Sequence, residues 1–262
     1  MDELPISVCI ISGAEAKRIG RALASVTGWV REIIVVLNDD VQDGTEEIAL
    51  RHGARVFREP WKGHVKQKNS AAAKAAQPWL LGLDADEAVS PELRAEIQRT
   101  LSDEARANAY AAFSFPRLTT FRGRWIRHGD WYPDRSIRLW KRGAAEWAGI
   151  DPHDKLQVRG KIARLHHNLL HYNAESIDHQ VTKIIAFSED FLRHEQTRAG
   201  RRAGRAALAF RPMWRFFRGY ILRLGFLDGW QGYYIAWMTA FYTATRYAKA
   251  VDAAREAKAP AA

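Results

Sequence analysis

The sequence predicts an α/β protein with a mostly parallel sheet flanked by helices. Two observations predict this class: apolar runs of strand length, and helix-forming segments that alternate with them. The expected strands are 6–11, 32–37, 55–57 and 79–83. Alternation at this spacing is typical of right-handed βαβ units, whose strands pair in parallel. Ligands bind beyond the carboxyl ends of such strands, so a site is expected at that edge of the sheet.

The first two strands are expected to be buried, because both are nearly continuous runs of β-branched and other apolar residues. The helices are expected at 19–27, 46–52, 65–76 and 91–101. Thr45 is expected to cap the second helix, and Ser90, followed by Pro91, the fourth. After residue 101 the sequence predicts a strand at 110–118, short strands and loops at 119–147, extended chain at 161–171 and a helix at 177–194.

The composition limits the class of protein. Hydrophobic residues make up 47% of 262 residues, enough for a large core, and the only cysteine, Cys9, rules out an internal disulfide. The acidic start and the lack of a long apolar stretch predict no secretory signal and no spanning helix. We therefore expect a cytoplasmic protein. Its net charge of +10 predicts an anionic partner.

Packed negative charge follows the fourth strand. Asp84, Asp86 and Glu87 come directly after an apolar run that begins at Trp79. Carboxylates this close repel one another, and a cation usually offsets that cost. Asp84 and Asp86 point the same way in extended chain, so they suit a divalent cation that holds a phosphorylated substrate. The alternative is an acidic turn that caps the helix after Ser90.

Ordered motifs extend across almost the whole chain. They are Ile6-Ser7-Val8 with Glu15, Glu32-Ile33-Ile34-Val35-Val36 with Asp43-Gly44-Thr45, Trp61-Lys62-Gly63 with Gln67-Lys68-Asn69, Trp79 to Glu87, Asp151-Pro152-His153-Asp154-Lys155, Leu169-Leu170-His171-Tyr172, and Gly225-Phe226-Leu227-Asp228-Gly229. Their order resembles the inverting GT-A glycosyltransferases of family 2, and more closely the bacterial lipopolysaccharide-core β-1,4-glucosyltransferase group. The resemblance implies a Rossmann-like GT-A fold. It also implies transfer of glucose from a UDP-sugar to a heptose of a lipid-linked inner-core saccharide.

The resemblance implies that Asp86 is the principal ligand of Mg²⁺ or Mn²⁺, and that Asp84 contacts ribose or metal. Ala85 lies between them in the nucleotide-sugar site. Glu87 is expected behind the ligands or at the sugar. His171 is expected to reach the metal or pyrophosphate, or else to be a hydrogen-bonded structural residue; His166 and His167 are weaker candidates for that site.

Glu15 and Asp39 are expected in the nucleoside pocket, although the turn from Asn38 to Gln42 departs from the family pattern. Lys68 is expected to pair with a phosphate or an acidic residue, or to lie on a solvated helix face. Arg138 is a candidate for the acceptor or the pyrophosphate.

Inversion in one step needs a base on the acceptor side. Asp154 is the candidate base. Asp151 and His153 compete for this role, and His153 alternatively orients the acceptor. The alternative for Asp154 is a carboxylate of the turn after Pro152.

We expect a catalytic domain at 1–175 and a helical extension at 176–262. Between 193 and 223 nine arginines stand against one acid, Glu195, among large apolar residues. Such a segment suits an anionic membrane surface at the inner face of the bacterial inner membrane. Alternatively, its aromatic residues pack on the catalytic domain or on a second subunit of a homo-oligomer. No nucleic-acid partner is expected.

Two other functions stay open at this point. One is the same transferase fold acting on another glycan or on a polyprenyl phosphate. The other is a non-catalytic membrane- or nucleic-acid-binding protein on a transferase scaffold.

Overall fold

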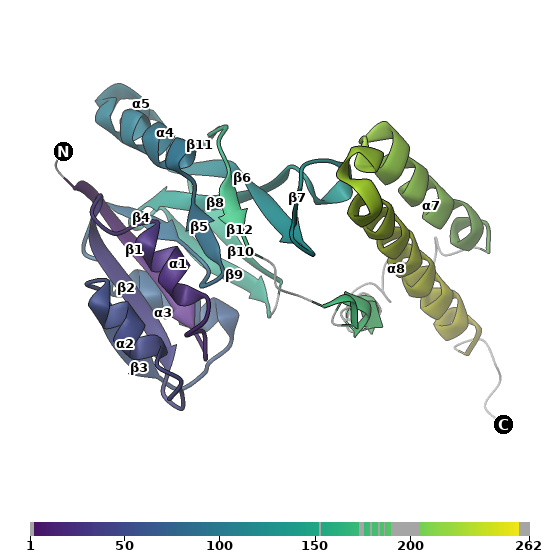
Figure 1. Ribbon diagram of the computed structural model, residues 1–262, viewed down its shortest axis with the longest axis horizontal. Coiled ribbons are helices and arrows are strands. Elements are labelled where there is room, and N and C mark those ends of the chain that lie inside the picture. Colours follow the sequence, from purple (N-terminus) through teal and green to yellow (C-terminus); the bar gives the residue numbers. More distant parts are fainter. Residues whose placement is uncertain are drawn as a thin grey trace. The chain divides into compact units, whose positions relative to one another are not determined.

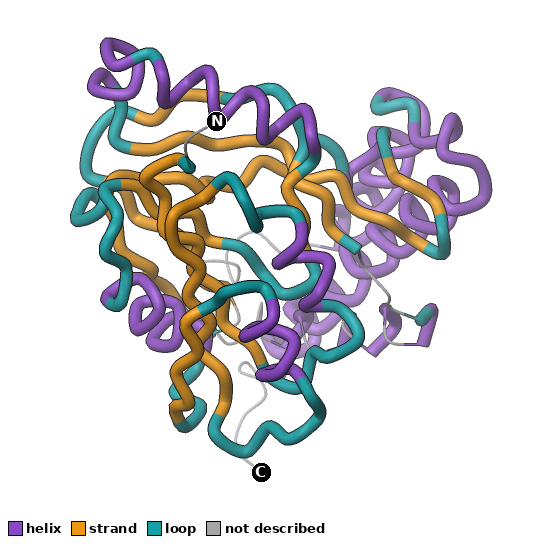
Figure 2. The backbone as a smooth tube through the Cα atoms, turned by 60° about the vertical axis from the view of Figure 1, so that its left-hand side comes forward, coloured by secondary structure: helices purple, strands orange, loops and turns teal. Residues whose placement is uncertain are grey.

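The chain divides into two units, the first formed by Met1–Leu118 and Asp134–Tyr172, the second by Thr119–Pro133 and Asn173–Ala262. The computed structural model describes residues 3–151, 153–172, 176–189 except 179, 183 and 186, and 205–256. Figures 1 and 2 show the elements of both units. The domain boundary at residue 175 stays a prediction.

Four parallel strands form one half of the main sheet. They are β1 (Leu4–Ser12), β2 (Val30–Asn38), β3 (Arg55–Glu59) and β4 (Trp79–Gly82), in the order β3-β2-β1-β4. All four predicted strands are thereby confirmed. Ile6, Val8 and Ile10 of β1 point to one face of the sheet and are fully buried there in a core cluster.

Three helices connect these strands (Figure 1): α1 (Ile19–Ala24), α2 (Thr45–Arg51) and α3 (His64–Ala73). Ile19 of α1 and Ala49 of α2 pack into the same core cluster as Ile6, whereas Ala71 of α3 packs with Cys9 and Val36 in a second cluster. The two helices α1 and α2 therefore cover one face of the sheet, and α3 covers the other.

The predicted cap of α2 is wrong by one position. Thr45 is the first helical residue, and Gly44 precedes it with φ 91°, in the left-handed region that favours glycine. Asp43 Oδ1 accepts hydrogen bonds from both the backbone N–H (3.1 Å) and the hydroxyl (2.5 Å) of Thr45. The side chain that serves the helix start is therefore that of Asp43.

The other half of the sheet is not parallel. Beyond β4 the order continues with β8 (Asp134–Lys141), β6 (Ala112–Phe121), β12 (Leu169–His171) and β5 (Glu87–Val89). Strand β8 is antiparallel to both β4 and β6, and β12 is antiparallel to β5, whereas the short β11 (Ile162–Arg164) runs parallel to β6. The sheet is therefore mixed: its parallel part is the half that the βαβ pattern predicts.

Two further helices and two further strands belong to the first unit. The helix predicted after Ser90 is confirmed as α4 (Pro91–Ser102), whose first turn is capped by the Ser90 hydroxyl, and α5 (Glu104–Ala109) follows it. A separate antiparallel pair is formed by β9 (Ala145–Ile150) and β10 (His153–Val158).

The second unit is largely helical, as predicted for the extension. It contains β7 (Arg124–Ile126), η1 (Gly129–Trp131), α7 (Arg205–Phe217), η2 (Arg218–Leu222), η3 (Gly225–Asp228) and α8 (Gly229–Glu256), and the described residues of 177–189 are also helical. No helix among the described residues is both long enough and apolar enough to span a bilayer.

The motif at 225–229 has a structural role within this unit. Asp228 is 2% exposed, and its Oδ2 accepts the backbone N–H groups of Arg127 (3.0 Å) and His128 (2.8 Å). A Cβ on Gly232 would lie 1.9 Å from the carbonyl oxygen of Gly225, so only glycine permits this close approach of η3 to α8. The motif therefore holds η3 against the start of α8.

Candidate functional site

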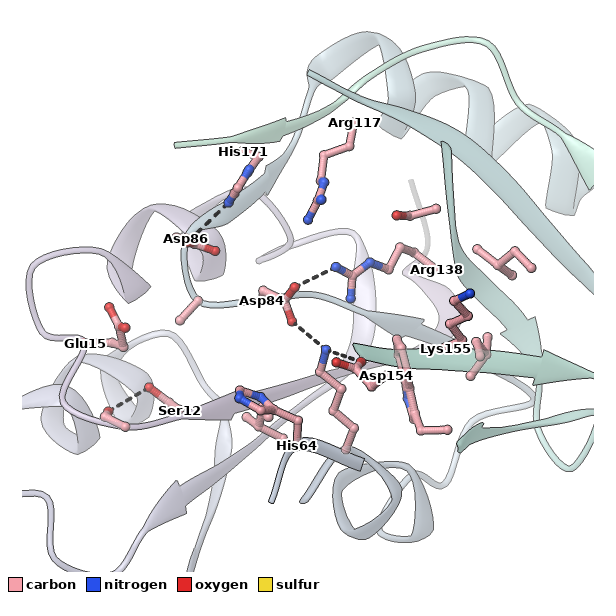
Figure 3. A pocket seen from close by; sticks show the side chains of 18 of the residues that line it. Ser12, Glu15, His64, Asp84, Asp86, Arg117, Arg138, Asp154, Lys155 and His171 are labelled. Atoms are coloured by element: carbon pink, nitrogen blue, oxygen red, sulfur yellow. Dashed lines mark hydrogen bonds and ion pairs between the residues drawn. The ribbon is translucent and has the colours of Figure 1, made fainter. Parts of the chain in front are cut away.

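A pocket of about 900 Å³ opens at the carboxyl edge of the parallel strands (Figure 3). The ends of β1, β2 and β4 contribute Ser12, Asn38 and Asp84 to its lining. Opposite them lie residues of β6, β8, β10 and β12. Of the predicted site residues, those that line the pocket are Glu15, Lys68, Asp84, Ala85, Asp86, Arg138, Asp154 and His171.

Asp84 is held between two cations. Its Oδ2 accepts a hydrogen bond of 2.6 Å from Arg138, and its Oδ1 lies 3.2 Å from Lys68 Nζ. Burial alone would raise the pKa of the Asp84 carboxyl, but the charges of Arg138 and Lys68 outweigh burial and hold that pKa well below its usual range. Asp84 is therefore a fixed anion whose charge two protein cations already balance.

Asp86 faces the pocket differently. Its Oδ2 lies 3.4 Å from His171 Nε2 across the β5–β12 edge (Figure 3). The Asp86 backbone carbonyl accepts the N–H of Tyr172 at 2.9 Å, which fixes the spacing of the two side chains. Burial raises the pKa of Asp86, but the hydrogen bond and the charge of His171 lower that pKa by more, so its net shift is downward.

The fit of a divalent cation can be tested on these side chains. Among the described residues, no group of three or more His, Cys, Asp or Glu side chains is placed to hold a metal. Asp86 and His171 nevertheless offer one carboxylate and one imidazole toward the pocket. Mg²⁺ and Mn²⁺ sites commonly use one or two protein carboxylates and complete their shell with substrate phosphates. The pair therefore fits such a cation when a diphosphate supplies the remaining oxygens.

Asp154 lies across the pocket, on β10. Its Oδ2 accepts a hydrogen bond of 2.9 Å from Lys68 Nζ. The pairing of α3 with β9 makes this contact possible: Asn69 donates from Nδ2 to the Trp147 carbonyl (2.8 Å) and accepts the Trp147 N–H at Oδ1 (2.9 Å). Because β9 pairs with β10, these two hydrogen bonds also fix Asp154 opposite Lys68.

The two competitors of Asp154 have different outcomes. Asp151 Oδ1 accepts the backbone N–H of Val65 at 3.0 Å, in the first turn of α3. Its other oxygen would lie 1.9 Å from a Cβ on Gly63, so glycine is required there, at φ 90°. Asp151 is thus engaged in holding the start of α3. The side chain of His153 lies outside the described residues.

Glu87 does not face the pocket. It is 1% exposed, its Oε2 accepts the Asp84 N–H at 3.0 Å, and its Oε1 lies 3.0 Å from Arg138 and 3.4 Å from Arg117. Burial lowers the pKa of the Arg138 guanidinium, but the carboxylates of Asp84 and Glu87 more than reverse this, so the pKa is raised. Glu87 therefore fixes two arginines that line the pocket, and its own buried side chain is not open to a sugar.

The two residues predicted for the nucleoside pocket, Glu15 and Asp39, have different outcomes. Glu15 lines the pocket and forms an ion pair with Arg18. Asp39 is exposed and does not line the pocket; its neighbour Asn38 does, and Asn38 Oδ1 is buried without a hydrogen-bond partner. At the end of β2 it is thus the Asn38 amide, and not the predicted Asp39 carboxylate, that lines the pocket.

Several lining residues were not predicted. They are His64, Trp61, Arg117, Arg135, Ser136, Trp147, Lys155 and Leu156, together with the chain at 11–13. Trp147 lies under the Lys68 ammonium, 4.5 Å from ring centroid to Nζ. Trp147 packs edge to face on Trp140, and a Cβ at Gly82 would lie 3.2 Å from Trp147, closer than an ordinary van der Waals contact. The segment 119–147, which contributes Arg135, Ser136 and Trp147, is rich in Trp, Arg and Gly, and this composition is the signal that could have indicated them. The histidines 166 and 167 do not line the pocket; their backbone N–H groups bond to Glu96.

Comparison with known proteins agrees with this architecture. The sequence model of a family described as "Glycosyl transferase family 2" matches residues 7–163. A protein of Rickettsia felis described as an uncharacterized glycosyltransferase is 31% identical over 259 residues, covering 93% of this chain and 88% of its own. The lipopolysaccharide core biosynthesis glycosyltransferase LpsC of Rhizobium meliloti is 25% identical, with 94% of each chain covered.

Among solved structures, that of residues 1–349 of S. aureus TarS with UDP-GlcNAc has a TM-score of 0.49 at 11% identity, and the match covers 98% of this chain and 93% of that one. A likeness of this size carries no argument about function. The family match and the two relatives extend over most of this chain, and they identify its family. Its Rossmann-like unit has the GT-A fold, and the chain belongs to glycosyl transferase family 2.

Proposed function

We propose that this glycosyltransferase moves a sugar, glucose by resemblance, from a UDP-sugar to a saccharide of the lipopolysaccharide inner core, with inversion at the anomeric carbon. One observation carries the proposal. A single pocket holds a carboxylate–imidazole pair, Asp86 and His171, and a separate carboxylate, Asp154, with the Lys68 ammonium between Asp84 and Asp154. That arrangement suits a reaction with an anionic leaving group on one side and a proton acceptor on the other.

The donor side supplies positive charge for a leaving diphosphate. Arg117, Arg135 and Arg138 line the pocket. Asp86 and His171 would hold Mg²⁺ or Mn²⁺, which when bound neutralises the charge that develops on the diphosphate. Asp84 would keep Arg138 and Lys68 in place in the wall of the same pocket, and these two cations balance its own charge.

The acceptor side supplies the base. Asp154 would accept the proton of the attacking hydroxyl as that oxygen bonds to the anomeric carbon and the bond to the diphosphate breaks. Attack from the face opposite the leaving group inverts the configuration. Lys68 holds the Asp154 carboxylate by the 2.9 Å hydrogen bond, so that the base is positioned before the acceptor binds.

The acceptor class is supported by relationship. The Rhizobium meliloti relative, which matches this chain over nearly its whole length, is described as acting in lipopolysaccharide core biosynthesis. Such an acceptor carries lipid, which agrees with the basic and aromatic composition of the second unit.

A donor and acceptor panel tests the proposal. The full chain is incubated with Mn²⁺, each of several UDP- and other nucleotide-sugars, and truncated lipopolysaccharide acceptors, and products are identified by mass spectrometry. We expect addition of one hexose from a UDP-sugar, with the opposite anomeric configuration by NMR. Transfer only to a non-lipopolysaccharide acceptor would contradict the acceptor assignment, and a retained configuration would contradict the role of Asp154.

A further inference from the structure

The second unit presents an apolar stripe along one side of α7. Six large apolar residues of α7 and η2 are more than two-fifths exposed: Phe210, Met213, Trp214, Phe217, Ile221 and Leu222. Most of them follow helical spacing of three or four residues, so they lie on one face of the helix. Phe210 is 72% exposed and Trp214 55%, values unusual for aromatic side chains that serve only as core. We call these six residues the α7 stripe.

Arginines flank this stripe. Arg215, Arg218 and Arg223 alternate with its residues along the chain, and all three are between 30% and 41% exposed. They converge on one carboxylate: Arg218 and Arg223 donate to Asp130 Oδ1 at 2.8 and 3.1 Å, and Arg215 lies 3.6 Å from Asp130 Oδ2. Three guanidinium groups around one carboxylate keep N–H donors to spare.

The charge of the whole unit has the same sign. Residues 119–133 and 173–262 contain seventeen Arg and Lys against nine Asp and Glu, a net charge of +8 of the chain's +10. A second stripe, formed by Trp230, Tyr233, Trp237 and Phe241, is about half exposed along α8. Ring contacts join the two helices, for example between Phe216 and Trp237 at 5.1 Å. Exposed aromatic and basic groups therefore occur together over much of the unit.

We propose that the α7 stripe and its flanking arginines are a docking surface for an anionic lipid bilayer, with the apolar side chains inserted at the level of the headgroups and the arginines on lipid phosphates. Trp, Phe and aliphatic groups bordered by Arg are the composition that binds at a membrane interface. The inference is independent of which sugar the first unit transfers.

A second copy of the chain fits this surface less well. A two-fold contact through the α7 stripe would bring the same arginines of both copies together. The net charge of +8 on the second unit of each copy would oppose that approach, whereas an anionic bilayer attracts it. Charge complementarity therefore favours lipid as the occupant.

Vesicle flotation of the full chain tests the proposal. Vesicles are made of phosphatidylcholine alone or of phosphatidylcholine with phosphatidylglycerol, at low and high salt. We expect flotation with the anionic vesicles and its loss at high salt, because screening weakens attraction to the surface. Equal flotation with both kinds of vesicle, or none with either, would overturn the assignment.

Matched variants locate the surface. Trp214→Ser combined with Phe217→Ser should weaken binding to anionic vesicles at least tenfold, while Leu50→Ser, at an exposed position of α2 in the first unit, should not. Arg215→Gln should weaken binding about fivefold, and Arg51→Gln on α2 should have no effect. An unchanged thermal unfolding midpoint shows that each variant folds. If the double serine variant still floats like wild type, the stripe is not the docking surface.

Sedimentation velocity tests whether a second copy of the chain, and not lipid, covers the α7 stripe. We expect the same sedimentation coefficient for wild type and for the Trp214→Ser, Phe217→Ser variant in the absence of lipid. A wild-type dimer that the double variant converts to monomer would show that a second copy covers the stripe, and would replace the lipid proposal.

Discussion

Lys68 donates a hydrogen bond of 2.9 Å to Asp154, from α3 to β10, across a pocket that residues 86 positions apart in the chain build together. The same ammonium lies 3.2 Å from Asp84. Among the described residues, Lys68 thus forms ion pairs both with the acidic strand end after β4 and with the carboxylate on β10. The donor and acceptor sides of the proposed reaction are coupled through it.

Asp154→Asn is expected to abolish most transfer while leaving nucleotide binding intact. The amide keeps the shape of the side chain but cannot take the acceptor proton, so kcat should fall by about 10²- to 10⁴-fold. Isothermal titration with UDP and Mn²⁺ should give an affinity within a few-fold of wild type. A variant that turns over at the wild-type rate would exclude Asp154 as the base.

Asp151→Asn is the matched control, three residues away. Its carboxylate accepts the Val65 N–H at the start of α3, and an amide oxygen can accept the same hydrogen bond, so we expect a loss of stability below about 0.5 kcal/mol and little change in kcat. Urea unfolding and initial rates measure the two effects. The reverse pattern, a large loss of rate with no loss of stability, would transfer the role of base to Asp151.

Lys68→Met is expected to lower kcat more than it raises KM for the donor, because it releases Asp154 and leaves Asp84 to Arg138 alone. Lys68→Arg should restore part of the rate, since a guanidinium can again pair with a carboxylate. The pH profile of kcat should shift in the methionine variant but not in a variant of Lys66 on the same helix. An unshifted profile with a raised KM only would mean that Lys68 serves donor binding.

Arg138→Met is expected to destabilise the protein by about 3 to 5 kcal/mol, the cost of removing one partner of a buried ion pair. Glu87, 1% exposed, would lose its closest cation, and Asp84 would keep only Lys68. Urea unfolding measures the free energy. Exposed Arg142→Met, next on the chain after β8, should change it by less than about 0.5 kcal/mol, and equal effects at both positions would refute the structural role given to Arg138.

Asp86→Asn is expected to remove much of the Mn²⁺-dependent gain in UDP affinity, by about ten- to a hundredfold. UDP binding measured in EDTA should change little, because the arginines of the pocket remain. His171→Ala should behave in the same way, and Asp39→Asn, on an exposed turn, should not. An Asp86 variant with an undiminished Mn²⁺ dependence would leave the carboxylate–imidazole pair without a metal role.

Glu59 is expected to make stability pH-dependent in acid. Hydrogen bonds from Lys62 and Lys74 lower its pKa from 4.5 to about 2. A lowered folded-state pKa stabilises the protein above pH 4.5, and this stability is lost as the pH falls through about 2. Wild type should exceed Glu59→Gln by about 1 kcal/mol at pH 7, since solvent screens the pair. That difference should shrink from pH 4.5 downward; a constant difference would contradict the assignment.

Local pattern alone was enough to predict the parallel half of the sheet. The strands 6–11, 32–37, 55–57 and 79–83 are short apolar runs with polar ends, and a run buried on both faces must be apolar wherever it lies. The cap of α2 was misplaced by one residue because Asp43 and Thr45 both suit an N-terminus, and only the φ of Gly44 separates them.

The antiparallel half depends on contacts distant in sequence. Strand β8 pairs with β4 although more than fifty residues separate them, and this insertion brings Arg138 to Asp84. No periodicity in the sequence records such a neighbour. For the same reason Glu87 was a candidate for the pocket, although its side chain turns inward to the two arginines.

The sequence by itself determined the residue types at the ends of β1, β2 and β4, because apolar strands and polar exits are local requirements of a covered sheet. Only the tertiary structure decided which carboxylates face one another. It aims Asp86 at His171, holds Asp154 and Asp84 on the ammonium of Lys68, buries Glu87 and leaves Asp39 outside. The physical reason is that the burial and charge partners of a side chain are set by strand order and register, which bring together residues far apart in the chain.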